Sequence, residues 1–228
     1  MTNQTTDIPT GIQRAQLPEP TLRRLPWYLA FLTTLRHDGV ANVSSTSIAK
    51  AVGVDASQIA KDLSFLSIKG KTRIGYEVAA LESELRSFLG FDEQHRAAIV
   101  GVGSLGSALM ADRGLQRYGL HIVAGFDVNP AVIGTQVAQT PVFAMADMER
   151  EARRLGISIA AITVPTDVAQ QVADTIVAAG IKAVWNFTPC RIQVPEGVVV
   201  QNTSIYAPLA VMYNRLYVAP GANPSRQP

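Results

Sequence analysis

A glycine-rich segment constrains the fold of this chain more than any other feature of its sequence. It fits the pattern G-x-G-x-x-G and follows an apolar run at residues 97–100, and a helix-forming run comes next. The segment comprises Gly101, Val102, Gly103, Ser104, Leu105 and Gly106. In this context the first glycine makes a tight turn, the second admits a pyrophosphate, and the third lets the helix pack on the strand. The pattern predicts a dinucleotide site with the pyrophosphate at the N-terminus of the helix.

An acidic residue selects between the two nicotinamide dinucleotides. Asp127 ends a second apolar run, about 20 residues beyond the glycine segment, where a carboxylate can accept hydrogen bonds from the adenosine ribose hydroxyls. A 2′-phosphate there would place like charges within about 4 Å, at a cost on the order of 4 kcal/mol at an effective dielectric near 20. No arginine follows, only Val128, Asn129 and Pro130. We therefore expect NADH and NAD as ligands rather than their phosphorylated forms.

Four short apolar runs in the second half of the chain alternate with helical segments. They cover residues 97–100, 122–126, 159–164 and 183–187. Buried strands that alternate with helices indicate a parallel, doubly wound sheet of the Rossmann type, whose ligands lie at the carboxyl ends of the strands. The last two strand ends are predicted to line the cleft, the first near the pyrophosphate or nicotinamide ribose and the second near the nicotinamide; ordinary strand-end turn chemistry is the alternative. Their residues are Thr163, Val164, Pro165, Asn186, Phe187 and Thr188.

A helix-turn-helix pattern precedes the expected sheet. A serine, Ser44 or Ser45, can cap the first helix, and Gly53 permits the turn between the helices. Asp55 and Gln58 form a capping pattern that opens the second helix, which we expect to run to about residue 66. The second of two helices at this spacing can lie in the major groove of DNA.

A basic, glycine-punctuated stretch follows the pattern and suits a short hairpin, or wing, that touches phosphate. Residues 56–76 contain four basic residues and one acidic residue, a net charge of +3. A helical hairpin used for protein contacts and a solvated charged face are the alternatives. The residues predicted to contact DNA are Ser45, Ser57, Gln58, Lys61, Ser64, Lys69, Lys71, Arg73 and Tyr76.

Composition excludes several classes of protein. The chain has 228 residues, a formal net charge of +2 and a hydrophobic fraction of 47%, which excludes general disorder. One cysteine, Cys190, excludes a disulfide framework and multi-cysteine metal sites, and we expect no metal. No apolar run approaches the ~18 residues that span a bilayer, and residues 1–10 are polar, so we expect a cytoplasmic protein with no membrane partner.

A dehydrogenase needs an acid–base group beside the nicotinamide. The three histidines, His37, His95 and His121, do not fall at strand carboxyl ends, and no segment is left for a substrate domain. Cys190 is expected to be a small buried hydrophobic residue. We predict no catalytic residue, no small-molecule substrate and no enzyme. A small NAD-dependent oxidoreductase with a helical appendage is the alternative, and a Rossmann-fold adaptor without DNA affinity is a third possibility.

Further motifs accompany those above. They are Arg24-Leu25-Pro26-Trp27-Tyr28, Ser44-Ser45, Gly53-Val54-Asp55, Lys61-Asp62-Leu63-Ser64, Gly75-Tyr76, Phe126-Asp127-Val128, Thr163-Val164-Pro165 and Asn186-Phe187-Thr188-Pro189. Together with the glycine segment, they make the chain resemble the Rex family of redox-sensing transcriptional repressors, over about residues 21–217. The resemblance implies a homodimer that binds an inverted-repeat operator through winged-helix domains. It also implies that NADH releases the protein from DNA, whereas NAD+ leaves it bound or competes with NADH.

The resemblance also gives a role to the C-terminal helix, expected at about residues 205–217. This stretch is apolar around much of its circumference, so it must be buried against something. In the family the helix is exchanged between subunits. The fold class is therefore α/β, a winged-helix domain followed by a Rossmann domain with a swapped C-terminal helix. The expected segments are a flexible arm (1–23), a winged-helix DNA-binding domain (24–90), a Rossmann NAD(H)-binding domain (91–202), a dimerisation helix (203–218) and a disordered tail (219–228).

The chain departs from the family at three positions. Ala60 stands in the recognition helix where members usually have arginine, Ser204 stands where many have aspartate, and Asp112 stands where some have tyrosine. In those members the aspartate pairs with the N-terminal arginine or with the tyrosine in alternate redox states. Arg24, Asp112 and Ser204 are accordingly the candidates for an interdomain switch, although Arg24 has two other possible roles, pairing with another acid or bracing the domain interface.

Overall fold

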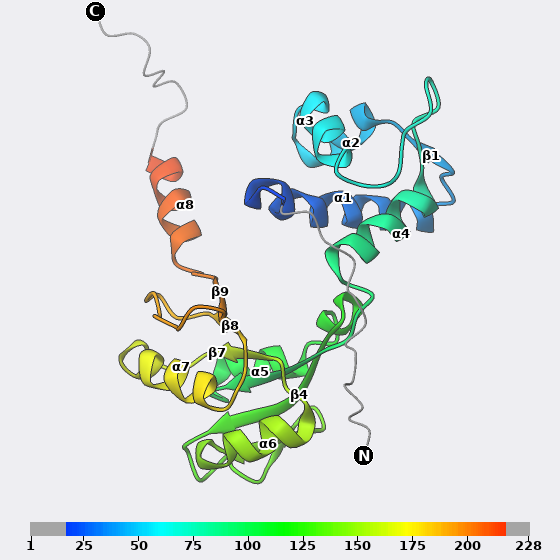
Figure 1. Cartoon of the computed structure of the whole chain (residues 1–228). Coiled ribbons are helices and arrows are strands. Elements are labelled where there is room, and N and C mark those ends of the chain that lie inside the picture. The colour runs from blue at the N-terminus through cyan, green and yellow to red at the C-terminus, as the bar shows by residue number, and fades with distance from the viewer. Residues whose placement is uncertain (1–16, 218–228) are drawn as a thin grey trace, which may run out of the picture. The chain divides into compact units, whose positions relative to one another are not determined.

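The structure is a computed structural model that describes residues 17–217. The chain divides between Glu93 and Gln94 into two compact units (Figure 1). The expected disordered tail, 219–228, lies outside the described residues. No helix of the described range combines the length and apolar character that crossing a membrane requires.

The first unit is helical and carries one small antiparallel ribbon, in which β1 pairs with β2. Local chemistry sets its second and third helices. The Ser44 hydroxyl accepts a hydrogen bond from the Ser47 amide (3.0 Å), and Gly53 ends that helix with φ +68°. Asp55 caps the next helix by accepting from the Ser57 amide (2.7 Å). The elements are α1 (Glu19–His37), β1 (Asn42–Val43), α2 (Ser45–Val52), α3 (Ala56–Leu63), β2 (Tyr76–Glu77) and α4 (Val78–Leu89).

Three expectations for this unit need correction. The flexible arm expected over residues 1–23 is too long, because α1 begins at Glu19 and buries Thr21. Residues 1–16 lie outside the described residues. The second helix of the pattern ends at Leu63 rather than near residue 66, because a turn then buries Leu66 in the core. The capping pattern expected of Asp55 and Gln58 is formed only by Asp55, because the Gln58 amide donates to a buried carboxylate described below instead of bonding back to the start of the helix.

The second unit is a seven-stranded sheet in the order β5-β6-β4-β3-β7-β8-β9, parallel throughout except for the pair β5–β6. The four predicted strands are present as β3 (His95–Val100), β4 (Leu120–Asp127), β7 (Ile159–Ile162) and β8 (Ala183–Asn186). Three further strands were not predicted. These are β5 (Gln136–Val137), β6 (Thr140–Ala144) and β9 (Val199–Asn202).

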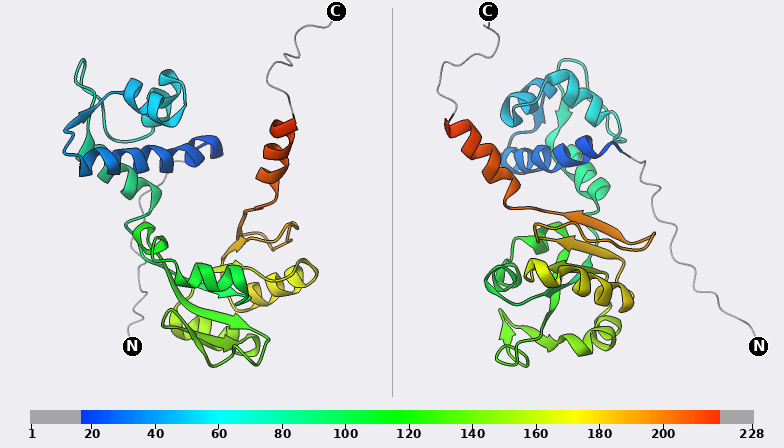
Figure 2. Two further views of the ribbon diagram at one scale, coloured as in Figure 1. Left: turned by 180° about the vertical axis from the view of Figure 1, so that it is seen from behind. Right: turned by 90° about the vertical axis from the view of Figure 1, so that its left-hand side faces the viewer.

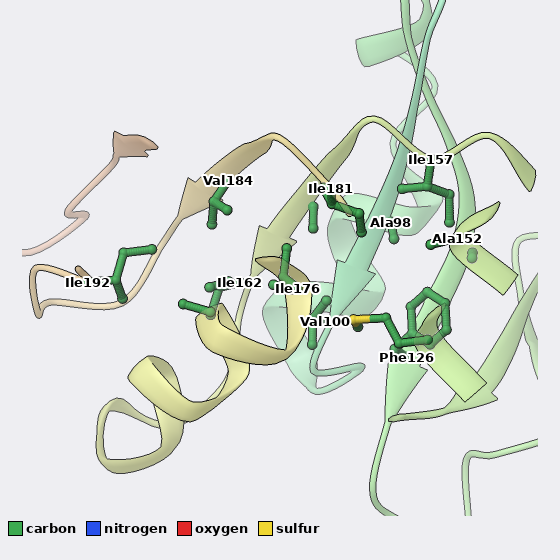
Figure 3. Packing of buried hydrophobic residues seen from close by; sticks show 14 of the residues in the cluster. Ala98, Val100, Phe126, Ala152, Ile157, Ile162, Ile176, Ile181, Val184 and Ile192 are labelled. Carbon is green, nitrogen blue, oxygen red and sulfur yellow. The ribbon is translucent and has the colours of Figure 1, made fainter. Parts of the chain in front are cut away.

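Helices cover both faces of this sheet, as a doubly wound fold requires. Successive side chains of a strand point to opposite faces. Ala98 and Val100 of β3 pack with α6 (Met148–Leu155) and α7 (Ala169–Ala178) (Figure 3). Ile99 packs with Met110 of α5 (Ser104–Ala111) on the other face.

The last helix, α8 (Ala207–Tyr217), contributes no buried residue, and Figure 2 shows it extending away from the sheet of its own unit. It begins at Ala207, where the Ser204 hydroxyl accepts from the amides of Tyr206 and Ala207 (both 3.3 Å). Its exposed apolar side chains include Val211, Met212, Tyr213, Leu216 and Tyr217. A helix of 11 residues that packs against nothing is marginal in water. Its burial against a second copy stays a prediction.

Candidate dinucleotide site and nucleic-acid interface

The glycine segment is closed against the sheet at one side and open at the other. Gly101 adopts φ +94°, and a Cβ at Gly106 would overlap the Gly101 carbonyl oxygen. Thr163 on the neighbouring strand end holds that turn, since its hydroxyl donates to the Gly101 carbonyl (2.7 Å). A Cβ at Gly103 would meet nothing within 4 Å. The open side lies at the second glycine, where the pattern predicts the pyrophosphate.

Asp127 lies against the same segment. Its Oδ2 accepts from the Val102 amide (2.6 Å), and its Oδ1 accepts from the amides of Val128 and Asn129 (2.7 and 2.8 Å). The carboxylate is therefore fixed beside the glycine turn by three backbone donors. Each oxygen has two lone pairs, so Oδ2 keeps capacity to accept a ribose hydroxyl.

A cavity of about 530 Å³ opens where β3, β4 and β7 end. It brings together six of the predicted site residues, namely Gly101, Gly103, Asp127, Thr163, Val164 and Pro165. Its remaining wall is largely apolar and was not predicted from the sequence. That wall consists of Val100, Phe126, Val128, Met145, Ala146, Val168, Gln171, Val172 and Thr175. Such a wall suits the flat face of a base.

Part of this missed wall carried a readable signal. Val168, Gln171, Val172 and Thr175 recur at helical spacing on the segment after β7, so they share one face of α7 and its first turn. Met145 and Ala146 could not be found in this way, because they follow β6, a strand the sequence did not reveal.

The structure does not bring the second strand-end motif into the cavity. Asn186 is fully buried, and its amide donates to the Cys190 carbonyl (2.7 Å) and to Asn202 Oδ1 (2.9 Å). Its Oδ1 accepts from both the amide and the hydroxyl of Thr188 (3.0 and 2.7 Å). All four hydrogen-bonding positions of the Asn186 side chain are therefore used inside the protein. In this structure Asn186 shapes the loop after β8, while Phe187 packs on Trp185 with ring centroids 4.5 Å apart.

The remaining predicted cofactor residues belong to the glycine segment itself. Val102 is buried, Ser104 and Leu105 are exposed in the first turn of α5, and Gly106 is buried beneath them. Cys190 is partly buried beside the Thr188 hydroxyl (3.2 Å). In the described range no three His, Cys, Asp or Glu side chains gather as a metal site.

The predicted nucleic-acid surface lies on α3 and the loop after it. Ser57, Lys61 and Ser64 are exposed on α3 and at its end, whereas Ser45 and Gln58 are half-buried. The wing is a loop closed by one bridge between Lys71 and Gly75 rather than a regular hairpin. The exposed cations of this loop are Lys69, Lys71 and Arg73, and Tyr76 lies half-buried on β2.

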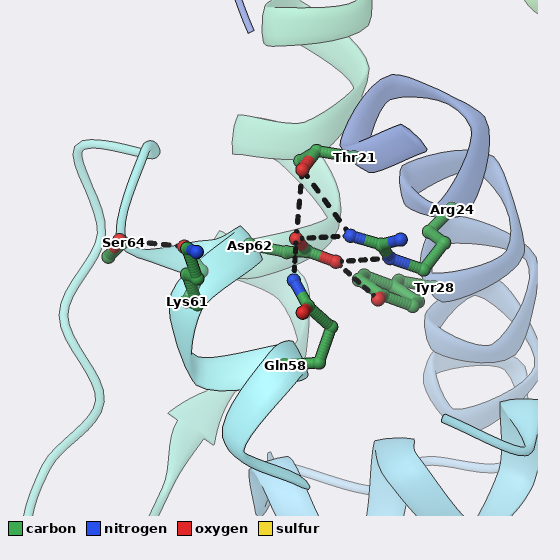
Figure 4. A network of polar contacts seen from close by, with 7 residues as sticks. All are labelled: Thr21, Arg24, Tyr28, Gln58, Lys61, Asp62 and Ser64. Carbon is green, nitrogen blue, oxygen red and sulfur yellow. Dashed lines mark hydrogen bonds and ion pairs between the residues drawn. The ribbon is translucent and has the colours of Figure 1, made fainter. Parts of the chain in front are cut away.

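A buried carboxylate, Asp62, joins α3 to α1 (Figure 4). Arg24 holds it with two hydrogen bonds, Nε to Oδ2 (2.7 Å) and Nη2 to Oδ1 (2.8 Å). The Tyr28 hydroxyl donates to Oδ2 (2.7 Å), and Gln58 Nε2 and the Thr21 hydroxyl donate to Oδ1 (2.8 and 3.0 Å). Burial alone would raise the pKa of Asp62, but these donors outweigh it and lower the pKa to about 2.

The three switch candidates have partners within their own units. Arg24 pairs with Asp62, as one of the alternative roles for it anticipated, and this pairing raises the pKa of Arg24. Asp112 ends α5, and its Oδ1 accepts from the Gly114 amide (2.6 Å). Ser204 caps α8. Their part in a switch between the units stays a prediction.

These features define a class: an α/β protein that joins a helix-turn-helix unit to a Rossmann-type unit with a dinucleotide-sized cavity. The profile of the family described as "Putative DNA-binding protein N-terminus" matches residues 16–64, and that of "CoA binding domain" matches residues 92–190. A protein from Bacteroides fragilis named redox-sensing transcriptional repressor Rex is 57% identical over 88% of this chain and 91% of its own length. A protein of the same name from Porphyromonas gingivalis is 56% identical over 90% and 94%. The chain belongs to the Rex family of redox-sensing transcriptional repressors.

Solved structures agree with this assignment. The crystal structure of RSP in complex with β-NAD+ and operator DNA has a TM-score of 0.84 at 34% identity, covering 88% of this chain and 92% of that one. The crystal structure of RSP in complex with β-NADH has a TM-score of 0.80 at 33% identity, covering 88% and 94%.

Proposed function

We propose that this chain is a homodimeric repressor that binds inverted-repeat operator DNA and releases it when NADH binds. The observation that carries the proposal is the cavity at the glycine turn, with Gly103 open and Asp127 fixed beside it, in the same chain as an exposed α3 and basic wing. RSP, its relative, binds β-NAD+ together with operator DNA and also binds β-NADH.

The cavity favours NAD(H) over NADP(H) and over coenzyme A. Both of the latter carry a phosphate on the adenosine ribose, and a dianion beside Asp127 costs on the order of 4 kcal/mol at an effective dielectric near 20. In the described structure no cation lines the cavity to offset that charge. We therefore take the match to a CoA-binding profile as evidence of a shared fold.

The operator interface consists of α3 and the wing. Lys61 and Ser64 face solvent on α3, and Lys69, Lys71 and Arg73 are exposed in the loop that follows. Cations on an exposed loop suit contacts to phosphate, and side chains on α3 suit contacts to base edges. A dimer would place two such helices in successive major grooves, about 34–36 Å apart. The apolar side chains of α8 support a dimer in which each helix is buried against the other subunit.

Discrimination between NADH and NAD+ arises at the nicotinamide end. The two differ by a hydride and one positive charge on that ring, while their adenosine halves are identical. A ligand shifts an equilibrium only by its differential affinity for the two states. We propose that NADH favours a dimer whose recognition helices no longer match the half-sites, with Asp112 and Ser204 among the groups that change partners.

We infer a regulator rather than an enzyme, acting in the cytoplasm where its operator lies. The relatives are named transcriptional repressors. In the described structure Asp127 is the only titratable residue that lines the cavity, and it lies at the ribose end. An oxidoreductase would require an acid–base group at the other end.

Fluorescence anisotropy on a labelled inverted-repeat duplex tests the proposal. At fixed salt, NADH is expected to release the duplex at a far lower concentration than NAD+. Raising the salt from 50 to 200 mM is expected to weaken binding by about 10³-fold or more if the dimer makes six or more phosphate contacts. Binding that neither cofactor alters, or the absence of salt-dependent binding, would contradict the proposal.

A further inference from the structure

The Asp62 carboxylate determines which way the Gln58 amide points. An ionised carboxyl group can accept hydrogen bonds but cannot donate them. Asp62 is ionised at neutral pH because its pKa lies near 2. Gln58 must therefore turn its nitrogen toward Asp62, and Nε2 lies 2.8 Å from Oδ1 (Figure 4). One N–H is used in this bond. The second N–H and the carbonyl oxygen Oε1 remain.

Those two groups match one base. Adenine presents the N7 acceptor and the N6 donor in the major groove, and a glutamine amide reads this pair with one N–H and its carbonyl oxygen. Gln58 is half-buried in the first turn of α3, one turn before the exposed Lys61. The Gln58 amide is thus held by a group that is itself fixed, since Arg24 and Tyr28 of α1 anchor the same carboxylate.

We infer that Asp62 is a positioning residue that presents Gln58 to read an adenine in each operator half-site. The inference rests on the proposed function, because it requires α3 to enter the major groove. Side chains held in advance lose less conformational freedom on binding, so the fixed amide gains affinity and selectivity for adenine.

The test begins with selection of duplexes from a randomised pool by the full chain without NADH. Each adenine of the selected operator is then replaced in turn by 7-deazaadenine, which lacks the N7 acceptor. For the natural protein, one position in each half-site is expected to show an affinity loss of about 2- to 12-fold, the effect of losing one of the two hydrogen bonds of the contact. A pool from which nothing is selected would contradict the proposed function itself.

Variants then assign the effect to the two residues. Gln58→Ala is expected to abolish the dependence on N7 at that position. Asp62→Ala leaves Gln58 in place but frees its amide, so the dependence is expected to fall toward that of Gln58→Ala. The double variant is expected to show no additional loss at that position. If Gln58→Ala retains the dependence seen in the natural protein, the inference is wrong, whatever Asp62→Ala does.

A matched control separates positioning from a general loss of stability. Glu82 is a second buried carboxylate that ties two helices in the described part of the first unit, and it accepts from Thr33 and Arg36 (both 2.8 Å). Glu82→Ala is expected to lower the thermal midpoint as Asp62→Ala does and to keep the dependence on adenine N7. If Glu82→Ala also erases that dependence, or if Asp62→Ala keeps it in full, the positioning role is refuted.

Discussion

Gly103 offers a substitution that separates cofactor binding from stability. The residue has φ −79° and ψ −162°, which any side chain tolerates, and a Cβ built on it meets no protein atom within 4 Å. Gly103→Ala is therefore expected to change the free energy of unfolding by no more than about 0.5 kcal/mol. The added methyl group would occupy the open side of the loop, where the pyrophosphate is predicted to bind. Losing one hydrogen bond to a charged group costs about 1.5–3 kcal/mol, which raises the Kd of NADH about 10- to 150-fold.

Gly106→Ala is the contrasting variant in the same loop. Its Cβ would overlap the Gly101 carbonyl oxygen and lie 2.9 Å from Thr163 Oγ1, so α5 must move away from the strand. Overpacking of this kind costs about 1–3 kcal/mol, or about 2–12 °C in the thermal midpoint. Gly106→Ala is thus expected to lose stability, whereas Gly103→Ala loses affinity alone.

Isothermal titration with NADH and NAD+, together with thermal melts of the ligand-free protein, measures both effects. An NADH affinity of Gly103→Ala within threefold of the natural protein would show that the pyrophosphate does not approach this glycine. If Gly103→Ala lowers the melting point as far as Gly106→Ala does, the space beside Gly103 does not accommodate a side chain.

Three other predictions follow from the described contacts. Asp127→Asn removes the charge beside the ribose, so the preference for NADH over NADPH is expected to fall at least tenfold in titrations; an unchanged ratio would contradict this. The lowered pKa of Asp62 stabilises the fold above the unfolded pKa near 3.8, and the stabilisation is lost as the pH falls through about 2. Asp62→Asn is thus expected to lose about 2 kcal/mol of the difference in unfolding free energy between pH 7 and pH 2. Removal of residues 207–228 is expected to give a monomer in sedimentation; a persisting dimer would exclude α8 as the interface.

In the first unit the sequence predicted those helix ends that are set by neighbouring residues in the chain. Ser44, Gly53 and Asp55 act at helix ends through their own side chains or backbone angles, so their roles are readable from neighbours in the chain. The capping role expected of the Gln58 side chain was wrong, because its amide bonds to Asp62 instead of to the cap. Arg24 shows the same limit, since its partner lies 38 positions away and the pairing depends on how α1 packs against α3.

The second unit was predicted where strands are central and apolar. Runs such as Ile159–Ile162 are buried on both faces and stand out from their surroundings. The short strand β5 and the strands β6 and β9 lie toward the sheet edges, and β6 contains Pro141, so neither periodicity nor composition marked them. Asn186 was recognised as special from its strand end, but its network of internal hydrogen bonds could not be read from the sequence.

Communication between the two ligands has a physical constraint in this chain. Among the described residues, one cluster of buried apolar side chains, which includes Leu25 and Leu85, lies entirely before Glu93. The two clusters that contain Val100 and Ile99 lie entirely after it, so each unit has its own buried core. We expect cofactor binding to act through the placement of the units in the dimer, which α8 would join. Coupling of this kind is reciprocal: if NADH weakens operator binding by 5- to 150-fold, bound operator weakens NADH by the same factor. An NADH affinity that bound operator leaves unchanged would mean that NADH does not weaken operator binding at equilibrium, which would refute this coupling.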